Sequence, residues 1–441
     1  MLDLINNIVW GPATIILVLG CGIYFTLRIK FFQFKNFKLV LKNTIFSFNI
    51  KKNKDKISSF QAVSAALAGT IGTGNIAGVA TSISLGGPGS VFWMIVSAFF
   101  IMMTKYAEVV LAVKFREKSK KGEYVGGPMY YMENALGLKK LGIFFAILLA
   151  ISSLGVGNMV QANSVSDALL NTLSVKPSVT GFILMLICSL VIMGGGRKIL
   201  SATEIIVPLM AVFYIIGTIF FLSINYKHIP TALISIFTDA FSQTSITGGA
   251  CGILVSKAVK YGISRGVFTN EAGIGSSPVA HACADAQSPV HQGLWGIFEV
   301  FFDTVVMCTL TALVILTAAG GITAKSGLTG INLTIASFET VFGRAGGLFI
   351  SLSMIFFAIA TILGWCLYGE KAISYLFKEN KTVLFIYKTI YISAIYIGSI
   401  LSIDFVWTLS DIFNGLMILP NILTLFLLGK HVIDETKKTD L

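Results

Sequence analysis

The sequence predicts an all-α protein that crosses the membrane many times. Hydrophobic residues make up 55% of its 441 residues and charged residues only 12%, against about 25% charged in ordinary soluble proteins. The mean hydropathy is +0.82, and most of the chain falls into apolar runs long enough to span a bilayer, which takes about 20 helical residues. This composition excludes a soluble globule, a disordered chain, a collagen and a coiled coil.

Eleven membrane-spanning segments are predicted along the chain. Ten apolar runs lie at 4–28, 59–84, 90–115, 141–171, 178–195, 201–224, 292–319, 345–376, 382–402 and 408–430. The eleventh is the interrupted stretch 233–284, which we count as one broken span preceded by an amphipathic approach. The first run lacks a basic start and a small-residue cleavage site, so we expect it to be retained. Because no gap holds a separate soluble domain, residues 1–441 are expected to form a single transmembrane domain.

The basic residues of the loops predict the orientation, since Lys and Arg accumulate in cytoplasmic loops. Alternate loops, beginning after the first span and ending with the tail, hold 25 of them, against four on the opposite side. We therefore expect the N-terminus outside and the C-terminus in the cytoplasm. The net charge of +12 is then a topology signal with a role for anionic lipid, and no nucleic-acid partner is expected. Lys257, Lys260 and Arg265 do not fit this scheme.

Motifs of enzymes and of resident cofactors are missing from the sequence. It contains no HExxH, no Walker Gly-Lys-Ser/Thr and no GxSxG motif. No CxxC pair is present either, so the cysteines are expected to be small buried hydrophobes rather than disulfide partners or zinc ligands. They are Cys21, Cys188, Cys251, Cys283, Cys308 and Cys366. We therefore expect neither an enzyme nor a cofactor.

The second run is interrupted at membrane depth. Residues 68–78 read Ala-Gly-Thr-Ile-Gly-Thr-Gly-Asn-Ile-Ala-Gly, and each glycine weakens a helix by about 1 kcal/mol relative to alanine. Unwound backbone at this depth is tolerated where it lines a cavity or is buried in protein. Close helix packing through Gly74-xxx-Gly78 is the alternative. Thr73 and Asn75 favour a binding site, because they add side-chain oxygens that packing does not require.

A second break of the same kind is predicted about 200 residues later. Residues 266–278 read Gly-Val-Phe-Thr-Asn-Glu-Ala-Gly-Ile-Gly-Ser-Ser-Pro, a polar, glycine-rich stretch with proline inside a membrane region. Its acidic residue, Glu271, either acts at the break or caps a half-helix. The sequence leaves these two roles equally open.

The two breaks divide the chain into two related halves. Five spans follow from each break, and an odd number per half places residues 59–224 and 233–430 in opposite orientations, as an inverted repeat. Residues 1–30 are then an extra helix and residues 431–441 a cytoplasmic tail. Paired broken helices in opposed halves indicate a midplane binding site, where half-helix N-termini face an anionic group and freed carbonyls hold a cation. This pattern favours alternating access over a channel.

Ionisable residues inside the spans are costly in lipid and need partners. Lys105 and Glu108, three residues apart, are expected to pair with each other. Glu299 and Asp303, four residues apart, put two like charges on one face, so a partner or a proton is expected nearby. His281 either relays protons or forms an ordinary hydrogen bond.

Several stretches of the sequence resemble the alanine or glycine:cation symporter family, the sodium:alanine symporters. They are 69–78, Gly86–Met94, Thr104–Glu108, Gly126–Tyr131, Thr269–Pro278 with His281, Asp303–Thr309, Leu363–Trp365 and Tyr368–Lys371. These stretches follow one order over most of the chain, so the resemblance is specific. One departure is Ile95, where the family usually has Trp after Met; this affects packing more than binding.

The resemblance implies both a fold and a function. The fold is of the leucine-transporter type, with a five-plus-five inverted repeat and here one extra N-terminal helix. The function is sodium-coupled symport of alanine or glycine across the cell membrane by a monomer in the lipid bilayer. Proton coupling, and serine or glutamine as substrate, remain alternatives. The stoichiometry and the preference among alanine, glycine and their D-forms also stay open.

The resemblance further implies the residues of the site. The substrate residues are Gly72, Thr73, Gly74, Asn75, Gln161, Phe268, Thr361 and Trp365. The cation residues are Ala68, Ile71, Asn75, Asn270 and Thr361. A pocket walled by the two aromatic rings suits a methyl or hydrogen side chain and clashes with a large one.

Helical spacing adds two expectations about these residues. Thr361 and Trp365 are four apart, so they share one face of their helix. Gln161 follows Asn158 by one turn, so both are expected on one side. A hydrogen bond between helices is the alternative role for Gln161.

Overall fold

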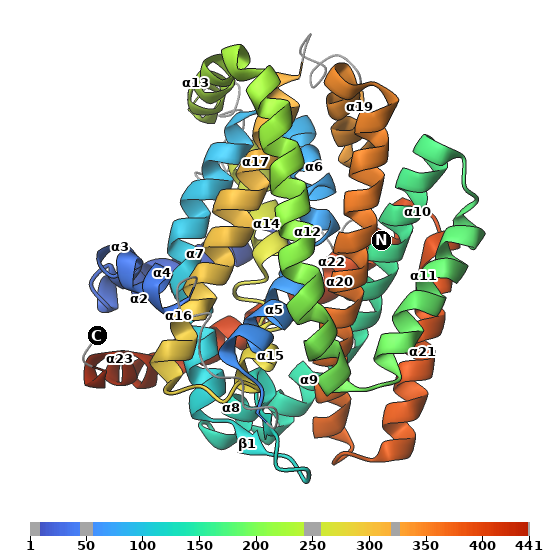
Figure 1. Cartoon of the computed structure of the whole chain (residues 1–441). Coiled ribbons are helices and arrows are strands. Elements are labelled where there is room, and N and C mark those ends of the chain that lie inside the picture. Colours follow the sequence, from blue (N-terminus) through green and yellow to red (C-terminus); the bar gives the residue numbers. More distant parts are fainter. Residues whose placement is uncertain (1–8, 45–55, 242–256, 319–326, 440–441) are drawn as a thin grey trace.

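The computed structural model describes residues 9–44, 56–241, 257–318 and 327–439, and nearly all of them are helical (Figure 1). In this part of the chain the only strands are β1 (Glu117–Lys118) and β2 (Tyr124–Val125), which form an antiparallel hairpin pairing Glu117 with Val125. The hairpin and α8 (Pro128–Asn134) lie at one end of the bundle, and α13 (Ile229–Ala240) lies at the other. The predicted all-α class is confirmed.

The helices follow the predicted spans in order. The first predicted half contains α5 (Ser59–Thr70), η2 (Thr73–Asn75), α6 (Ala77–Gly86), α7 (Gly89–Lys114), α9 (Lys139–Leu154), η3 (Gly155–Met159), α10 (Val160–Leu173), α11 (Pro177–Ile192) and α12 (Gly196–Ile224). The second contains α13, α14 (Lys257–Asn270), α15 (Pro278–Ala282), α16 (Pro289–Val300), η6 (Phe301–Cys308), α17 (Thr309–Thr317), α19 (Gly330–Phe342), α20 (Arg344–Leu376), α21 (Lys381–Ile400) and α22 (Ile403–Leu427). Outside the halves, or between them, are α2 (Pro12–Arg28), α3 (Phe32–Lys35), α4 (Phe37–Asn43), η4 (Tyr226–His228) and α23 (Gly429–Lys438).

Among the described residues, seven helices are long and apolar enough to cross a membrane, and the bent pair α5–α6 makes eight. Two shorter apolar helices, α2 and α11, coincide with the predicted spans 4–28 and 178–195. The helices α14 and α15 fall on the predicted second broken span, although residues 242–256 of that stretch lie outside the described part. A polytopic membrane protein is confirmed, and the count of eleven spans stays a prediction.

The broken helices lie in the middle of the bundle. The helix α5 packs against α12 and α20, while α14 packs against α6 and α7. The helices α10, α11 and α21 pack together as one flank, on the right in Figure 1. Four segments that are far apart in the sequence therefore meet around the breaks: α5–α6, α10, α14–α15 and α20.

The first break is present where it was predicted. Ser58 and Gln61 start α5 with a capping box, each side chain accepting the other's backbone N–H at 3.0 Å. The helix ends at Thr70, and its direction changes by 56° before α6 continues. Ile71 and Gly72 have extended backbone between the two helices.

Of the two glycines in the packing motif Gly74-xxx-Gly78, only Gly74 packs closely, since a Cβ on it would lie 3.1 Å from Thr269 Cγ2. A Cβ atom added to Gly78 would meet nothing within 4 Å. Close packing also occurs between Gly69 and Gly364, because a Cβ on Gly364 would come within 2.7 Å of the Gly69 nitrogen. The helices α5 and α20 thus approach more closely than a larger residue allows, and the unwound segment follows directly.

The second break depends on left-handed backbone. After α14, Glu271, Gly273 and Gly275 have φ of 55°, 86° and 86°, a region that glycine enters at little cost. The Ser276 hydroxyl donates to Glu271 Oε2 at 2.5 Å. This bond ties Glu271 to the loop that leads into α15, but Glu271 does not cap that helix, whose N-cap Ser277 has no side-chain cap hydrogen bond.

Candidate functional site

The first break, α10 and α20 meet at one point. Gln161 Oε1 accepts the Thr73 backbone N–H at 3.2 Å. A Cβ on Gly72 would lie 2.7 Å from Thr361 Oγ1 and 3.3 Å from Gln161 Oε1. The side of Gly72 that carries no side chain, its bare face, is therefore next to both residues. The structure therefore brings these four predicted substrate residues together.

The helix α20 also covers the carbonyls that are left free where α5 ends. The Thr361 hydroxyl donates to the Ile71 carbonyl at 3.4 Å, and Trp365 Nε1–H donates to the Gly69 carbonyl at 3.3 Å. The predicted shared face of Thr361 and Trp365 is therefore confirmed. Ala68 lies in the last turn of α5, one turn before Ile71, and is fully buried.

Asn75 and Asn270 meet at a separate place, around an acidic residue. Asn75 Nδ2–H donates to Asp303 Oδ1 at 2.7 Å and to its backbone carbonyl at 3.2 Å. The Thr304 hydroxyl donates to Asp303 Oδ2 at 2.8 Å and accepts from Asn270 Nδ2–H at 3.1 Å. All four side chains are fully buried.

The five predicted cation residues therefore fall into two groups. Ala68, Ile71 and Thr361 of α20 meet at the end of α5, whereas Asn75 of η2 and Asn270 of α14 contact η6. Sequence reasoning placed Asp303 among the charges that need a partner but did not join it to the two asparagines. The available signal was its position at membrane depth, while its distance of 228 residues from Asn75 hid the contact.

Phe268 closes another side of the first break. A Cβ on Gly74 would lie 3.5 Å from Phe268 Cδ1, so the aromatic ring lies against η2, directly after the unwound residues; its role as a pocket wall stays a prediction. Two neighbours of this ring were not predicted. Trp407 of α22 is stacked on it, with ring centroids 5.5 Å apart, and the Arg265 guanidinium lies 5.5 Å from its centroid.

The expected side-by-side arrangement of Asn158 and Gln161 is wrong. Asn158 Nδ2–H donates to the Tyr391 carbonyl of α21 at 2.6 Å, whereas Gln161 faces the first break. The cause is the π-helical turn η3, which contains Asn158. A π turn holds more residues than an α turn and so rotates the residues before it relative to those after it.

The expected pair of Lys105 and Glu108 is also wrong. Lys105 Nζ lies 3.3 Å from Glu299 Oε1 and donates to Ser277 Oγ at 2.5 Å. Glu108 Oε1 instead accepts the Gly273 N–H at 3.0 Å and Asn421 Nδ2–H at 2.6 Å. Lys105 and Glu108 thus each contact residues of other helices rather than each other. Lys105 is the partner that the buried Glu299 was expected to need.

His281 joins this ionic cluster. Its Nε2 lies 2.8 Å from Glu299 Oε2, and its Nδ1 accepts from Gln292 Nε2–H at 2.9 Å. All three side chains are fully buried. His281 thus links Glu299 to Gln292, and both roles considered for His281 stay predictions.

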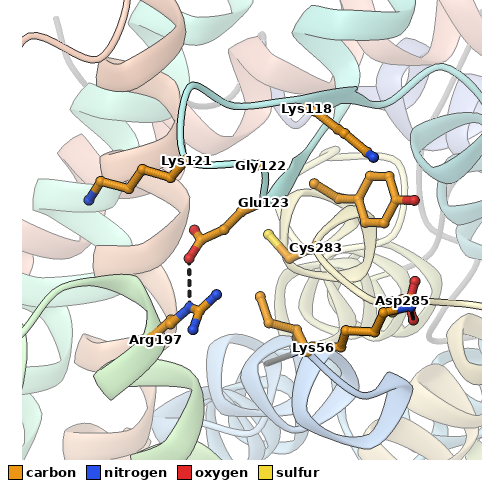
Figure 2. Close-up of a pocket in the computed structure, with 10 residues that line it drawn as sticks. Lys56, Lys118, Lys121, Gly122, Glu123, Arg197, Cys283 and Asp285 are labelled. Carbon is orange, nitrogen blue, oxygen red and sulfur yellow. Dashed lines mark hydrogen bonds and ion pairs between the residues drawn. The ribbon is translucent and has the colours of Figure 1, made fainter. Parts of the chain in front are cut away.

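An open cavity of about 270 Å³ lies away from the breaks, at the hairpin end of the bundle (Figure 2). Four basic and two acidic side chains line it, and Arg197 Nε–H donates to Glu123 Oε1 at 2.7 Å. Lys56 Nζ donates to Asp285 Oδ2 at 2.7 Å, and this hydrogen bond raises the pKa of Lys56 above its ordinary value. None of the lining residues belongs to the predicted site, so this cavity is not the candidate binding site.

Together, two breaks that meet at the middle of a helical bundle define a secondary active transporter of the leucine-transporter type rather than an enzyme. Comparisons with known proteins agree with this class. The chain belongs to the sodium:alanine symporter family, whose model matches residues 1–440.

The relatives and structural neighbours cover nearly the whole chain. It is 44% identical to the sodium/alanine symporter AgcS of Methanococcus maripaludis, over 99% of this chain and 96% of the relative. It is 37% identical to the probable sodium/glutamine symporter GlnT of Bacillus subtilis, over 98% and 88%. The fold resembles MhsT in complex with L-phenylalanine, with a TM-score of 0.62, 14% identity and coverage of 86% and 92%. It also resembles a Na⁺-coupled sialic acid symporter, with a TM-score of 0.55, 13% identity and coverage of 97% and 85%.

Proposed function

We propose that this protein carries alanine, and glycine as a second substrate, into the cell together with sodium. The observation that supports the substrate class is the meeting of Thr73, Gln161 and Thr361 around the bare face of Gly72. A backbone N–H there suits a carboxylate, and the hydroxyl and amide oxygens suit an ammonium group. In the present structure Gln161 Oε1 occupies the Thr73 N–H, and a substrate carboxylate would take that place. A monomer suffices, because both breaks belong to one chain.

The two groups of oxygen ligands support sodium as the coupling ion. One consists of the Ala68 and Ile71 carbonyls with Thr361. At the other, the Asp303 carboxylate supplies the oxygens, while the amide oxygens of Asn75 and Asn270 accept the Gly72 and Ala272 N–H groups at 2.9 and 3.0 Å. Sodium is a hard cation that takes oxygen ligands, and carbonyls exposed at broken helices are where such ions bind in transporters. Each group is proposed as a cation position, and only the second includes a carboxylate.

Calorimetry of purified protein tests both parts of the proposal. We expect alanine to bind more tightly in sodium than in potassium, and alanine to raise sodium affinity by the same factor, because coupling between two ligands is reciprocal. Uptake into proteoliposomes, with and without a proton gradient, then distinguishes sodium coupling from proton coupling. Equal alanine binding in both salts, with uptake that follows the proton gradient, contradicts sodium coupling. Glutamine binding more tightly than alanine contradicts the substrate.

The position of Phe268 predicts the size limit of the substrate. The variants Phe268→Leu and Phe268→Ala replace the ring that faces Gly74 with a smaller side chain. They are therefore expected to let the amino acids valine and leucine compete with labelled alanine. One methylene in an apolar pocket changes affinity by only about 1–3 kcal/mol, and an added hydroxyl is also rejected only weakly there, so discrimination of alanine from 2-aminobutyrate or serine should stay modest. Phe92 of α7, which packs against Trp93 of the same helix and Phe237 of α13, offers a control for the same substitution. Unchanged exclusion of leucine by an active Phe268 variant would place the pocket wall elsewhere.

We further propose that the N-terminus lies outside the cell membrane and the C-terminus in the cytoplasm, from the 25-to-4 asymmetry of basic residues. Cysteines introduced at Lys54, which lies outside the described residues, and at Lys437 are expected to resist a membrane-impermeant thiol reagent in intact cells. A cysteine at Lys227, which is exposed and predicted to be outside, is the positive control. The five native cysteines that the structure describes are buried, so their background labelling should be low. Labelling of both test positions from outside overturns the orientation.

A further inference from the structure

Arg265 connects the wall of the proposed site to α22. Its side chain is 18% exposed and lies one turn before Phe268 on α14, and its NH2 group is 3.4 Å from Asp411 Oδ2. The guanidinium carbon lies 5.5 Å from the centroid of the Phe268 ring and 5.7 Å from that of Trp407. These distances are within the range of a cation–aromatic attraction. The Arg265 guanidinium therefore contacts the Phe268 ring, the Trp407 ring and the Asp411 carboxylate.

The two rings form a continuous wall. They are stacked with centroids 5.5 Å apart and planes 25° from parallel. Phe268 faces Gly74 of the first break, while Trp407 lies behind it on α22. The ring that faces Gly74 is therefore in contact with both Arg265 and Trp407.

The link between α14 and α22 consists of side chains. The helix α14 packs closely on α6 and α7, but its backbone hardly approaches α22. A helix that is joined to its neighbour by long side chains can separate from it without breaking a packed backbone interface. Asp411, in turn, is anchored, because its backbone carbonyl accepts Trp10 Nε1–H at 2.9 Å.

The ion pair has unused bonding capacity. Within the described part of the chain, Arg265 Nε and Asp411 Oδ1 are buried and have no hydrogen-bond partner. An arginine fork can make two parallel hydrogen bonds to one carboxylate, whereas the single N–O contact here is 3.4 Å long. A small approach of α14 to α22 would satisfy both atoms and would tighten the wall.

We propose that Arg265 is a positioning residue that closes the Phe268–Trp407 wall over the substrate, with Asp411 as its anchor. Trp407 is then a second determinant of side-chain size, acting through Phe268. Arg265 does not touch the substrate in this role. The inference rests on the proposed function, since the wall that it closes is that of the alanine site.

Alanine uptake per transporter in proteoliposomes tests this role through KM and competition by valine. Arg265→Met and Trp407→Leu are each expected to raise KM about 3- to 10-fold, as expected for the loss of one aromatic or cation–aromatic contact, and to increase competition by valine. Trp407→Phe keeps a ring and should stay close to the parent. Arg265→Lys keeps the charge but loses the planar stack and fork, so its KM should lie between those of the parent and Arg265→Met.

Lys260→Met is the matched control. Lys260 is on the same helix, and its ammonium lies 5.8 Å from the centroid of another ring, Tyr261, so its loss should leave KM unchanged. Variants at Arg265 and Trp407 that show only a lower maximal rate, with the parent's KM and valine competition, overturn the proposal, because less functional protein explains that result. A parent that takes up no alanine contradicts the proposed function instead. If the parent takes up alanine and the Arg265 and Trp407 variants keep its KM and valine competition, only the positioning role of Arg265 is contradicted.

Discussion

Asp303→Asn is expected to abolish the effect of sodium on alanine binding and to lower sodium-driven uptake by more than about 10-fold. Coupling between two ligands typically amounts to a 5- to 150-fold change in affinity, and this variant should lose it. The Asp303 carboxylate is fully buried, and in the described part of the chain no basic side chain forms an ion pair with it. Asn75 and Thr304 donate hydrogen bonds to this carboxylate, but a buried negative charge without a cationic partner is still unfavourable, so a bound cation is the natural compensation. Asparagine keeps the shape of the side chain and removes the charge.

Calorimetry in sodium and in potassium measures this directly, with uptake as a second readout. Asp167→Asn is the matched control: Asp167 is a half-buried acid on α10 that accepts Asn171 Nδ2–H at 3.2 Å, and its loss should leave sodium dependence intact. An Asp303→Asn protein that binds alanine with the parent's sodium dependence would show that the charge belongs to the fold and not to ion binding. A proton gradient that replaces sodium in the parent, and fails in the variant, would instead assign a proton to Asp303.

Lys105→Met is expected to destabilise the protein by about 3–5 kcal/mol, which is the usual cost of removing one partner from a buried ion pair. Both side chains of the Lys105–Glu299 pair are completely buried. Without the ammonium, the Glu299 carboxylate keeps hydrogen bonds to His281 and Ser277 but loses the lysine charge, and Ser277 loses its donor. The loss is therefore one of uncompensated charge more than of contact area.

Thermal unfolding in detergent measures the effect, and the same substitution at Lys114 controls for it. Lys114 is on the same helix and lies 2.7 Å from Glu435 Oε1, but its side chain is 23% exposed. A pair near water contributes about 0–1 kcal/mol, so Lys114→Met should unfold close to the parent. Adding Glu299→Gln to Lys105→Met should recover part of the loss, because it removes the stranded charge. Equal stability of the two single variants would contradict this account of the cluster.

Features that depend on local chain chemistry were predictable from the sequence. The break after Thr70 follows from the density of glycine among residues 68–78, and left-handed backbone at Gly273 and Gly275 follows from glycine in the second break. The shared face of Thr361 and Trp365 follows from helical spacing alone. Each of these is decided within a few residues, so the sequence alone carries the information.

Partners of buried polar groups were not predictable in the same way. Lys105 has an acid three residues away, yet it pairs with Glu299, 194 residues distant. The turn η3 rotated Asn158 away from Gln161, and Arg265, which did not fit the topology pattern, proved to be bound to Asp411. In each case the choice was made by which helices face each other at that depth.

The sequence by itself determined that this chain is a helical membrane protein with two broken helices, because composition and glycine placement act through local backbone energetics and burial in lipid. Only the tertiary structure decided how the candidate residues divide between the end of α5 and the surroundings of Asp303. It also decided that Trp407 and Arg265 stand behind Phe268. The physical reason is that a buried charge or amide must find its partner in space, and the helix packing that supplies the partner depends on residues hundreds of positions apart.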